Sequence, residues 1–142
     1  MKRNSRLSLA LHTLSHMASD PERVRTSAEI ASHAGTNPVV VRRVLGKLRE
    51  AGLLSSEKGH AGGWRLAKSA RTISLADVYL ALGERLVSGT DAQTPKQLCD
   101  VETDLHERIG RVLADIEDSL VARLSETTLT DVHPSTCSFC QT

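Results

Sequence analysis

Aromatic residues are scarce in the 142-residue sequence, which contains only Trp64, Tyr79 and Phe139. Proteins that bind RNA or single-stranded DNA usually stack bases on several aromatic rings. Three rings spread along the chain do not make such a platform, so this class of binding is not expected.

Long apolar runs are also missing, and no stretch approaches the roughly twenty apolar residues that a membrane-spanning helix requires. The first residues place basic side chains before apolar ones, as a secretory signal does, but Thr13 and Ser15 interrupt the apolar run and no convincing cleavage site follows. We therefore interpret residues 1–18 as an amphipathic helix, and we expect a cytoplasmic protein with no membrane partner. The buried face of this helix is predicted to contain Leu7, Leu11, Leu14 and Ala18.

Motifs of common enzyme classes are absent as well. The sequence has neither the GxSxG of a nucleophile elbow nor the HExxH of a zinc protease, and no GK[ST] follows its glycine cluster. Its six histidines are dispersed along the chain. We therefore expect no enzymatic activity, and the sequence predicts no metal site.

Residues 26–52 carry the start and stop signals of two short helices. Thr26 and Glu29 have the spacing of a capping box, and Gly35 suits the left-handed end of that helix. Asn37 can then cap a second helix that begins at Pro38. The apolar residues at helical spacing, which we expect in the core, are Ala28, Ile30, Ala31 and Ala34 in the first helix and Val41, Val44, Leu45 and Leu48 in the second.

A glycine-rich ribbon is predicted after these helices. Gly52 ends the second helix, and Gly59, Gly62 and Gly63 permit the positive backbone dihedral angles of a tight reversal. Two helices followed by such a ribbon are typical of a winged helix-turn-helix, which places its second helix in the DNA major groove with the wing beside it. Trp64 is expected to anchor the ribbon to the helices.

Basic side chains mark the surface that we expect to meet DNA. Arg42 and Arg43 lie in the amino-terminal half of the second helix, where bidentate contacts with guanine are possible. Lys47 and Arg49 lie further along and are expected to contact phosphates or to remain surface charges, and Arg49 can also pair with a carboxylate. A solvated helix face is the simpler interpretation, but the turn before this helix and the ribbon after it favour DNA.

Charge is divided unevenly between the two halves of the chain, although the net charge is only +1. Residues 1–72 contain 13 Lys and Arg against 5 Asp and Glu, which gives +8, and residues 73–142 contain 5 against 12, which gives −7. The basic half therefore coincides with the helix-turn-helix, as phosphate neutralisation requires. Lys58 and His60 at the ribbon tip add groups that suit the minor groove or the DNA backbone.

The run from the amino terminus to about Glu84 resembles the Rrf2-type family of bacterial winged-helix regulators, which includes IscR, NsrR and CymR. The resemblance lies in SLALHTLSHMA, AEIA, VVVRRVLGKLREAGLLSSEKGHAGGWRLA and ISLADVYLALGE. It implies a dimeric transcriptional regulator, with repression as the expected action, whose DNA contacts lie within residues 39–43 and 58–62. The complete set of residues expected at the DNA is Thr26, Asn37, Val39, Val40, Arg42, Arg43, Lys47, Lys58, His60 and Gly62.

A long amphipathic helix is predicted from about residue 99 to residue 126. Its apolar residues recur every three or four positions with charged residues between them. A domain this small cannot bury the whole stripe, so we expect a homodimer whose two-fold symmetry matches a palindromic operator in double-stranded DNA. The alternative is a stripe folded back onto its own domain. The stripe comprises Val101, Leu105, Ile109, Val112, Ile116, Leu120 and Leu124.

The predicted fold is mostly α-helical with a small β-ribbon: a winged helix-turn-helix with a long C-terminal dimerisation helix. Ser74 and Asp77 form a second capping box, which opens a short helix after the wing. The division of the chain is a DNA-binding domain at 1–86, a linker or sensor loop at 87–98, the dimerisation helix at 99–126 and a tail at 127–142.

Three cysteines indicate a redox signal. In a cytosolic protein, thiols are more often reduced, metal-bound or redox-active than paired in structural disulfides. Cys99 is expected in the first turn of the long helix, where backbone amides stabilise a thiolate, although Asp100 and Glu102 oppose this effect. In the resembling family this junction holds the sensor cysteines. We therefore expect Cys99 to sense oxidants or electrophiles, with Cys137 and Cys140 as further redox thiols.

The main alternative is a regulator that depends on an iron–sulphur cluster. Cluster-binding members of the family use three closely spaced cysteines, whereas Cys99 is the only one between residues 88 and 101. Cys137 and Cys140 could complete a site with His106 or His133, but their spacing does not support this geometry. No obligatory cofactor is therefore expected.

Two further classes of function are less consistent with the sequence. A thiol-disulfide enzyme would use Cys137 and Cys140, but this pair lies at the chain end without the βαβ context of that motif. A protein-interaction module built on the long helix alone would leave the wing and the charge asymmetry unexplained.

Overall fold

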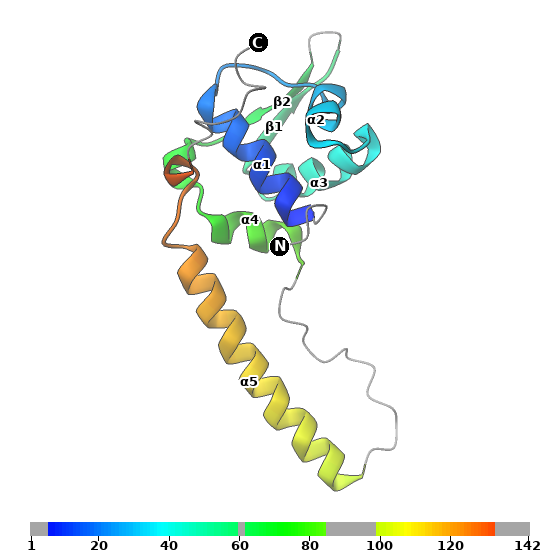
Figure 1. Cartoon of the computed structure of the whole chain (residues 1–142), viewed down its shortest axis with the longest axis vertical. Helices are drawn as coiled ribbons and strands as arrows, with labels where there is room; N and C mark the ends of the chain where they lie inside the picture. Colours follow the sequence, from blue (N-terminus) through cyan, green and yellow to red (C-terminus); the bar gives the residue numbers. More distant parts are fainter. Residues whose placement is uncertain (1–5, 60–61, 85–98, 133–142) are drawn as a thin grey trace.

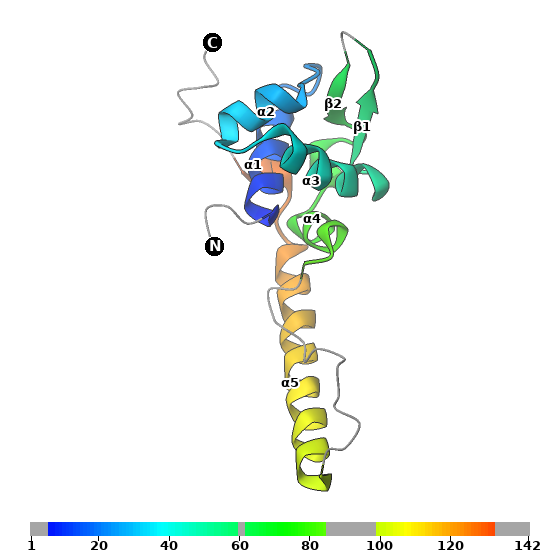
Figure 2. The ribbon, with the colours of Figure 1, turned by 90° about the vertical axis from the view of Figure 1, so that its right-hand side faces the viewer.

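The computed structural model describes residues 6–59, 62–84 and 99–132. Figure 1 shows a head of short helices from which one long helix projects, and Figure 2 shows the same projection after a quarter turn. The elements are α1 (Arg6–Ser19), α2 (Ser27–Ala34), α3 (Pro38–Glu50), β1 (Leu54–Glu57), β2 (Gly63–Leu66), η1 (Ala70–Thr72), α4 (Leu75–Leu82), α5 (Asp100–Leu124) and η2 (Leu129–Asp131). This architecture confirms the predicted winged helix-turn-helix with a C-terminal helix.

The helix caps in the head are those predicted. The amide of Glu29 donates to Thr26 Oγ1 at 3.2 Å while the amide of Thr26 donates to Glu29 Oε2 at 2.8 Å, which completes the capping box of α2. Gly35 ends that helix with φ +68°. Asn37 Oδ1 accepts the Val40 amide at 3.1 Å and so caps α3. These caps fix the tight turn between α2 and α3.

The core of the head is formed by apolar residues from α1, α3, α4 and the ribbon. All four apolar residues predicted on α3 are buried, and Leu14 and Ala10 of α1 are completely buried. The prediction for α2 was wrong in part, because Ile30 and Ala31 are buried while Ala28 is exposed. Eight residues make barely two turns, so only a narrow stripe of α2 meets the core.

The wing is an antiparallel pair of strands in which Leu54 lies opposite Leu66 and Glu57 lies opposite Gly63. Gly59 has φ +107°, as its predicted role in the reversal requires. Gly62 and Gly63 do not share that role. Both are confined by space: a Cβ on Gly62 would overlap the carbonyl oxygen of Glu57, and a Cβ on Gly63 would lie 2.5 Å from the carbonyl oxygen of Arg25.

The first two thirds of α5 leave the head and carry an uncovered apolar stripe. Its exposed fractions are 76% for Val101, 55% for Leu105, 44% for Ile109, 58% for Val112 and 48% for Ile116. This finding contradicts the fold-back alternative for residues 101–116. No helix among the described residues is long and apolar enough to cross a membrane.

The last turns of α5 and the residues after it return to the head. Leu120, Val121 and Leu124 pack against the core. Beyond the helix, the amide of Leu129 donates to the carbonyl of Ile73 at 3.0 Å, and the Leu129 side chain is completely buried. Leu129, which the predicted division places in the tail at 127–142, therefore contributes to the core of the head.

Candidate DNA-binding surface

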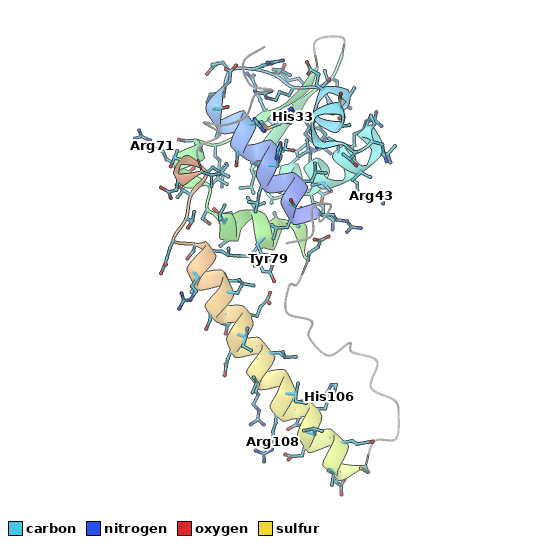
Figure 3. The ribbon with its side chains drawn as sticks, viewed as in Figure 1. His33, Arg43, Arg71, Tyr79, His106 and Arg108 are labelled. Carbon is cyan, nitrogen blue, oxygen red and sulfur yellow. The ribbon has the colours of Figure 1, made fainter. Side chains whose placement is uncertain are left out.

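Helix α3 presents two arginines on the side turned away from the core. Arg42 and Arg43 are exposed, whereas Val41 and Val44 beside them are buried. Figure 3 shows Arg43 on the outer side of the head. Within the described residues no hydrogen bond or ion pair holds either guanidinium group. Both groups are therefore available to an external anion.

Other arginines around the wing are neutralised within the head. Arg65 pairs with Glu57 across the ribbon at 2.6 Å, and Arg23 pairs with Glu29 at 3.6 Å. Lys58 follows β1 directly and is exposed. Arg42, Arg43 and Lys58 therefore keep a positive charge for an external partner, whereas Arg65 and Arg23 do not.

The carboxy-terminal half of α3 makes contacts within the head. Lys47 is half-buried, and its Nζ donates to the carbonyl of Leu82 at the end of α4, at 2.9 Å. Arg49 donates to Ser56 Oγ at 3.0 Å, and its guanidinium carbon lies 5.7 Å from the centre of the Trp64 ring. The partner of Arg49 is thus a hydroxyl group and an aromatic face, not the carboxylate suggested by the sequence. A phosphate contact by Lys47 stays a prediction.

Trp64 joins the wing to α2, which confirms its predicted role as an anchor. Its side chain is buried, and its indole Nε1 donates to Ser27 Oγ at 2.9 Å. Its backbone exchanges two hydrogen bonds with Arg25, of 2.8 and 3.0 Å. These contacts fix the wing relative to the helix-turn-helix.

The other predicted contact residues occupy varied positions. Thr26 and Asn37 are exposed at the helix caps that their side chains form, and Val39 is 58% exposed, whereas Val40 is half-buried and packs against the core. The Gly62 amide closes the wing turn by donating to the carbonyl of Gly59 at 3.0 Å. His60 lies outside the described residues. Contacts between these residues and DNA remain predictions.

Cys99 is the N-cap residue of α5 and is exposed. Its side chain makes no capping hydrogen bond. Figures 1 and 2 place this end of α5 far from the head. Cys137 and Cys140 lie outside the described residues.

An iron–sulphur cluster requires several thiolate or imidazole ligands close together. Cys99 is the only cysteine among the described residues, and it stands on the exposed end of a projecting helix. The iron–sulphur alternative therefore stays an untested prediction.

The structure brings together three histidines that the sequence analysis treated as dispersed. His12 and His16 of α1 meet His33 of α2, and one ring nitrogen of each lies within 4.8 Å of the others. The four-residue spacing of His12 and His16 was the only signal in the sequence, since it places two side chains on one face of a helix. The third histidine becomes visible only when α1 and α2 are packed together.

The fold and its exposed basic helix define a winged helix-turn-helix DNA-binding protein. The chain belongs to the Rrf2 family, described as "Iron-dependent Transcriptional regulator", whose profile matches residues 3–134. It is 33% identical over 130 residues to "Putative HTH-type transcriptional regulator YwnA" of Bacillus subtilis (strain 168), covering 91% of this chain and 95% of that protein. The protein is therefore a helix-turn-helix transcriptional regulator of this family.

Solved structures show the same fold. T. potens IscR aligns with a TM-score of 0.62 at 23% identity, covering 92% of this chain and 85% of that one. CymR (YrzC), the global cysteine regulator of B. subtilis, aligns with a TM-score of 0.60 at 21% identity, covering 96% and 99% of the two chains.

Proposed function

We propose that this protein is a homodimeric, redox-responsive repressor that binds a palindromic operator. In this proposal α3 and the wing contact the DNA, the projecting part of α5 pairs with a second copy, and Cys99 receives the signal. The observation that carries the proposal is the pair of exposed guanidinium groups at Arg42 and Arg43, which have no partner among the described residues. They lie on a helix whose opposite face is completely buried.

DNA recognition is supported by the rigidity of the surface around these arginines. Contacts from Lys47 to α4, and from Arg49 to the wing, hold the carboxy-terminal half of α3 in place. A recognition helix that is fixed at one end presents its other end to base edges with little loss of conformational freedom.

Pairing through α5 is supported by the exposed stripe from Val101 to Ile116. Contiguous apolar surface of this kind marks an interaction site in a soluble protein. A second copy is the occupant that we propose, because an isologous pair of α5 helices buries the same stripe on both chains. The pair would also relate two recognition helices by a two-fold axis, as a palindromic site requires.

The proposed signal is oxidation of Cys99 by a hydroperoxide. The thiolate attacks the nearer peroxide oxygen, the O–O bond breaks, and the leaving oxygen takes up a proton, as water when hydrogen peroxide is the oxidant. The sulphur loses two electrons and becomes a sulfenic acid, while the peroxide gains them. Condensation with another thiol, for which Cys137 and Cys140 are candidates, would then release a second water molecule and form a disulfide.

The DNA contact is tested with operator fragments selected from mixed genomic DNA by the wild-type protein. Arg42→Ala and Arg43→Ala are each expected to weaken specific binding by about 1–3 kcal/mol, measured by fluorescence anisotropy at several salt concentrations. Arg71→Ala is the matched control, because Figure 3 places Arg71 on the opposite side of the head and the charge change is equal. Wild-type affinity in both α3 variants would refute the proposed recognition face.

The dimer is tested by placing a charge on the stripe. Ile109→Glu is expected to convert the dimer into a monomer in sedimentation equilibrium and to lower operator affinity, because each half-site loses its partner. Ala114→Glu adds the same charge on the opposite face of α5 and is expected to remain dimeric. If the Ile109→Glu variant remains dimeric, the interface lies outside this stripe.

The signal is tested with Cys99→Ser. This variant is expected to keep its DNA bound when a hydroperoxide is added, whereas the wild-type protein releases it and recovers with a dithiol. Equal release by both proteins would exclude Cys99 as the sensor. Anaerobically purified protein is expected to be colourless. Charge-transfer bands in its visible spectrum would show a bound cluster and would contradict the thiol mechanism.

A further inference from the structure

Three imidazole rings from two helices meet in the head, at a place that the proposed DNA-binding function does not use. His12 and His16 are four residues apart on α1, and His33 lies in the last turn of α2. Nε2 of His16 lies 3.0 Å from Nε2 of His12 and 3.0 Å from Nε2 of His33. Figure 3 shows His33 beside α1, as these distances require.

Hydrogen bonding alone does not account for both short contacts of His16. A neutral imidazole nitrogen carries either one proton or one lone pair, which lies in the ring plane along a single direction. Nε2 of His16 can therefore donate or accept in only one of the two contacts. The other contact would then be a 3.0 Å approach of two nitrogens without a well-aligned hydrogen bond. A cation between the three rings removes this conflict, because each ring then points a lone pair at the same centre.

The surroundings of His12 and His16 favour the neutral imidazole that binds metals. Burial, followed by the neighbouring His12, His33 and Arg25, lowers the pKa of His16 to about 4. Burial and the neighbouring His33 also lower the pKa of His12. The lower pKa of these two rings reduces the competition between protons and a metal ion for their nitrogens.

We propose that His12, His16 and His33 bind one divalent transition-metal ion of the zinc class, with the fourth position taken by water. Metal–nitrogen bonds of 2.0–2.1 Å in a tetrahedral site separate two ligand nitrogens by about 3.3 Å, so the observed 3.0 Å contacts need only a small adjustment. His12 is exposed, which leaves one side of the site open to solvent.

The ligand set also indicates which ions fit. Imidazole nitrogens suit zinc, copper, nickel and iron rather than magnesium or calcium. The guanidinium group of Arg25, which donates to the carbonyl of His16 at 3.3 Å, adds a positive charge near the site and further disfavours ions held only by charge. A bound metal would join α1 to α2 and stabilise the helix-turn-helix. The site shares no residue with the proposed DNA contacts or with Cys99.

The test uses full-length protein stripped by a chelator and titrated with Zn²⁺, and separately with Co²⁺ as a coloured substitute. We expect one metal ion per chain, visible d–d bands for Co²⁺ without a thiolate charge-transfer band, and a metal-dependent rise in melting temperature. His12→Ala is expected to lower the affinity at least about a hundredfold, because even a lost outer-shell partner costs 10–100-fold. His106→Ala, on α5, is the matched control and is expected to bind normally.

A variant with Ser at positions 99, 137 and 140 separates this site from a thiolate site and is expected to keep its metal. Loss of metal in that variant, unchanged binding by His12→Ala, or no binding by the wild-type protein would each overturn the proposal. His12 is exposed, so its removal is not expected to disturb folding, and circular dichroism checks this. If the His12→Ala variant is misfolded, His33→Ala replaces it with the same expected loss.

Discussion

Replacement of Gly63 by alanine should destabilise the head through the attachment of the wing. The added Cβ would lie 2.5 Å from the Arg25 carbonyl oxygen and 2.9 Å from Val24 Cγ1. Ordinary contact begins at 3.4 Å, so the strand must move away from residues 24 and 25 by about 0.9 Å. That movement lengthens both backbone hydrogen bonds between Arg25 and Trp64.

The expected cost follows from these contacts. Overpacking of this kind costs about 1–3 kcal/mol, and two weakened hydrogen bonds contribute about 0.5–1.5 kcal/mol each. Some of the strain is relieved as the bonds lengthen, so a total of about 2–4 kcal/mol is expected. For a chain of this size, each kcal/mol lowers the melting temperature by roughly 4 °C, which gives a decrease of roughly 8–16 °C.

Gly46→Ala is the matched control, because it adds the same methyl group in the middle of α3, where no atom lies within 4 Å of the new Cβ. Alanine is the better helix former, so this variant should gain about 0.5–1 kcal/mol. Both variants are measured by thermal unfolding followed by circular dichroism. A melting temperature of Gly63→Ala equal to that of the wild-type protein would refute the steric argument.

Three further changes test other contacts. Tyr79→Phe removes the 2.5 Å hydrogen bond from the tyrosine hydroxyl to Glu117 and should lower the free energy of unfolding by about 1–3 kcal/mol in urea titrations. If the double variant with Glu117→Leu loses the sum of the two single losses, the hydrogen bond contributes nothing. Lys47→Met should reduce stability by about 1–3 kcal/mol through the lost bond to Leu82. The same variant tests the predicted phosphate contact, because a salt-dependence slope smaller by about one would place Lys47 on a phosphate and an unchanged slope would exclude that contact. The hydrogen bond from the Thr26 backbone lowers the pKa of Glu29. The Glu29 carboxylate therefore stabilises the fold above its ordinary pKa of 4.5, and this stabilisation is lost as the pH falls through the lowered pKa. Glu29→Ala should flatten the acid side of the curve of unfolding free energy against pH, and an unchanged acid side would contradict this.

The helix-turn-helix could be predicted from the sequence because its signals are local. The capping box of Thr26 and Glu29, the cap at Asn37 and the spacing of the α3 core residues each involve neighbours within one or two turns. The anchoring role of Trp64 was also predicted correctly, because an aromatic side chain of this size in a ribbon can be buried only against the neighbouring helices. The exposed arginines of α3 follow from the same helical spacing.

The features that escaped prediction depend on elements far apart in the sequence. The bond from Lys47 to Leu82 spans 35 residues, and the meeting of His16 with His33 spans 17. The spacing of residues in α1 does not predict which side of α2 packs against this helix. The role of Gly63 likewise depends on Arg25, which approaches the ribbon from the start of the helix-turn-helix.

The buried position of Leu129 has a consequence for the biosynthesis of the protein. The chain leaves the ribosome from its amino terminus, so α1, α3 and α4 emerge well before the residue that completes their core. Until residue 129 follows, the nascent head carries an uncovered apolar site beside Ile73. A stop codon anywhere in α5 should therefore yield a poorly soluble head and not a monomeric DNA-binding fragment.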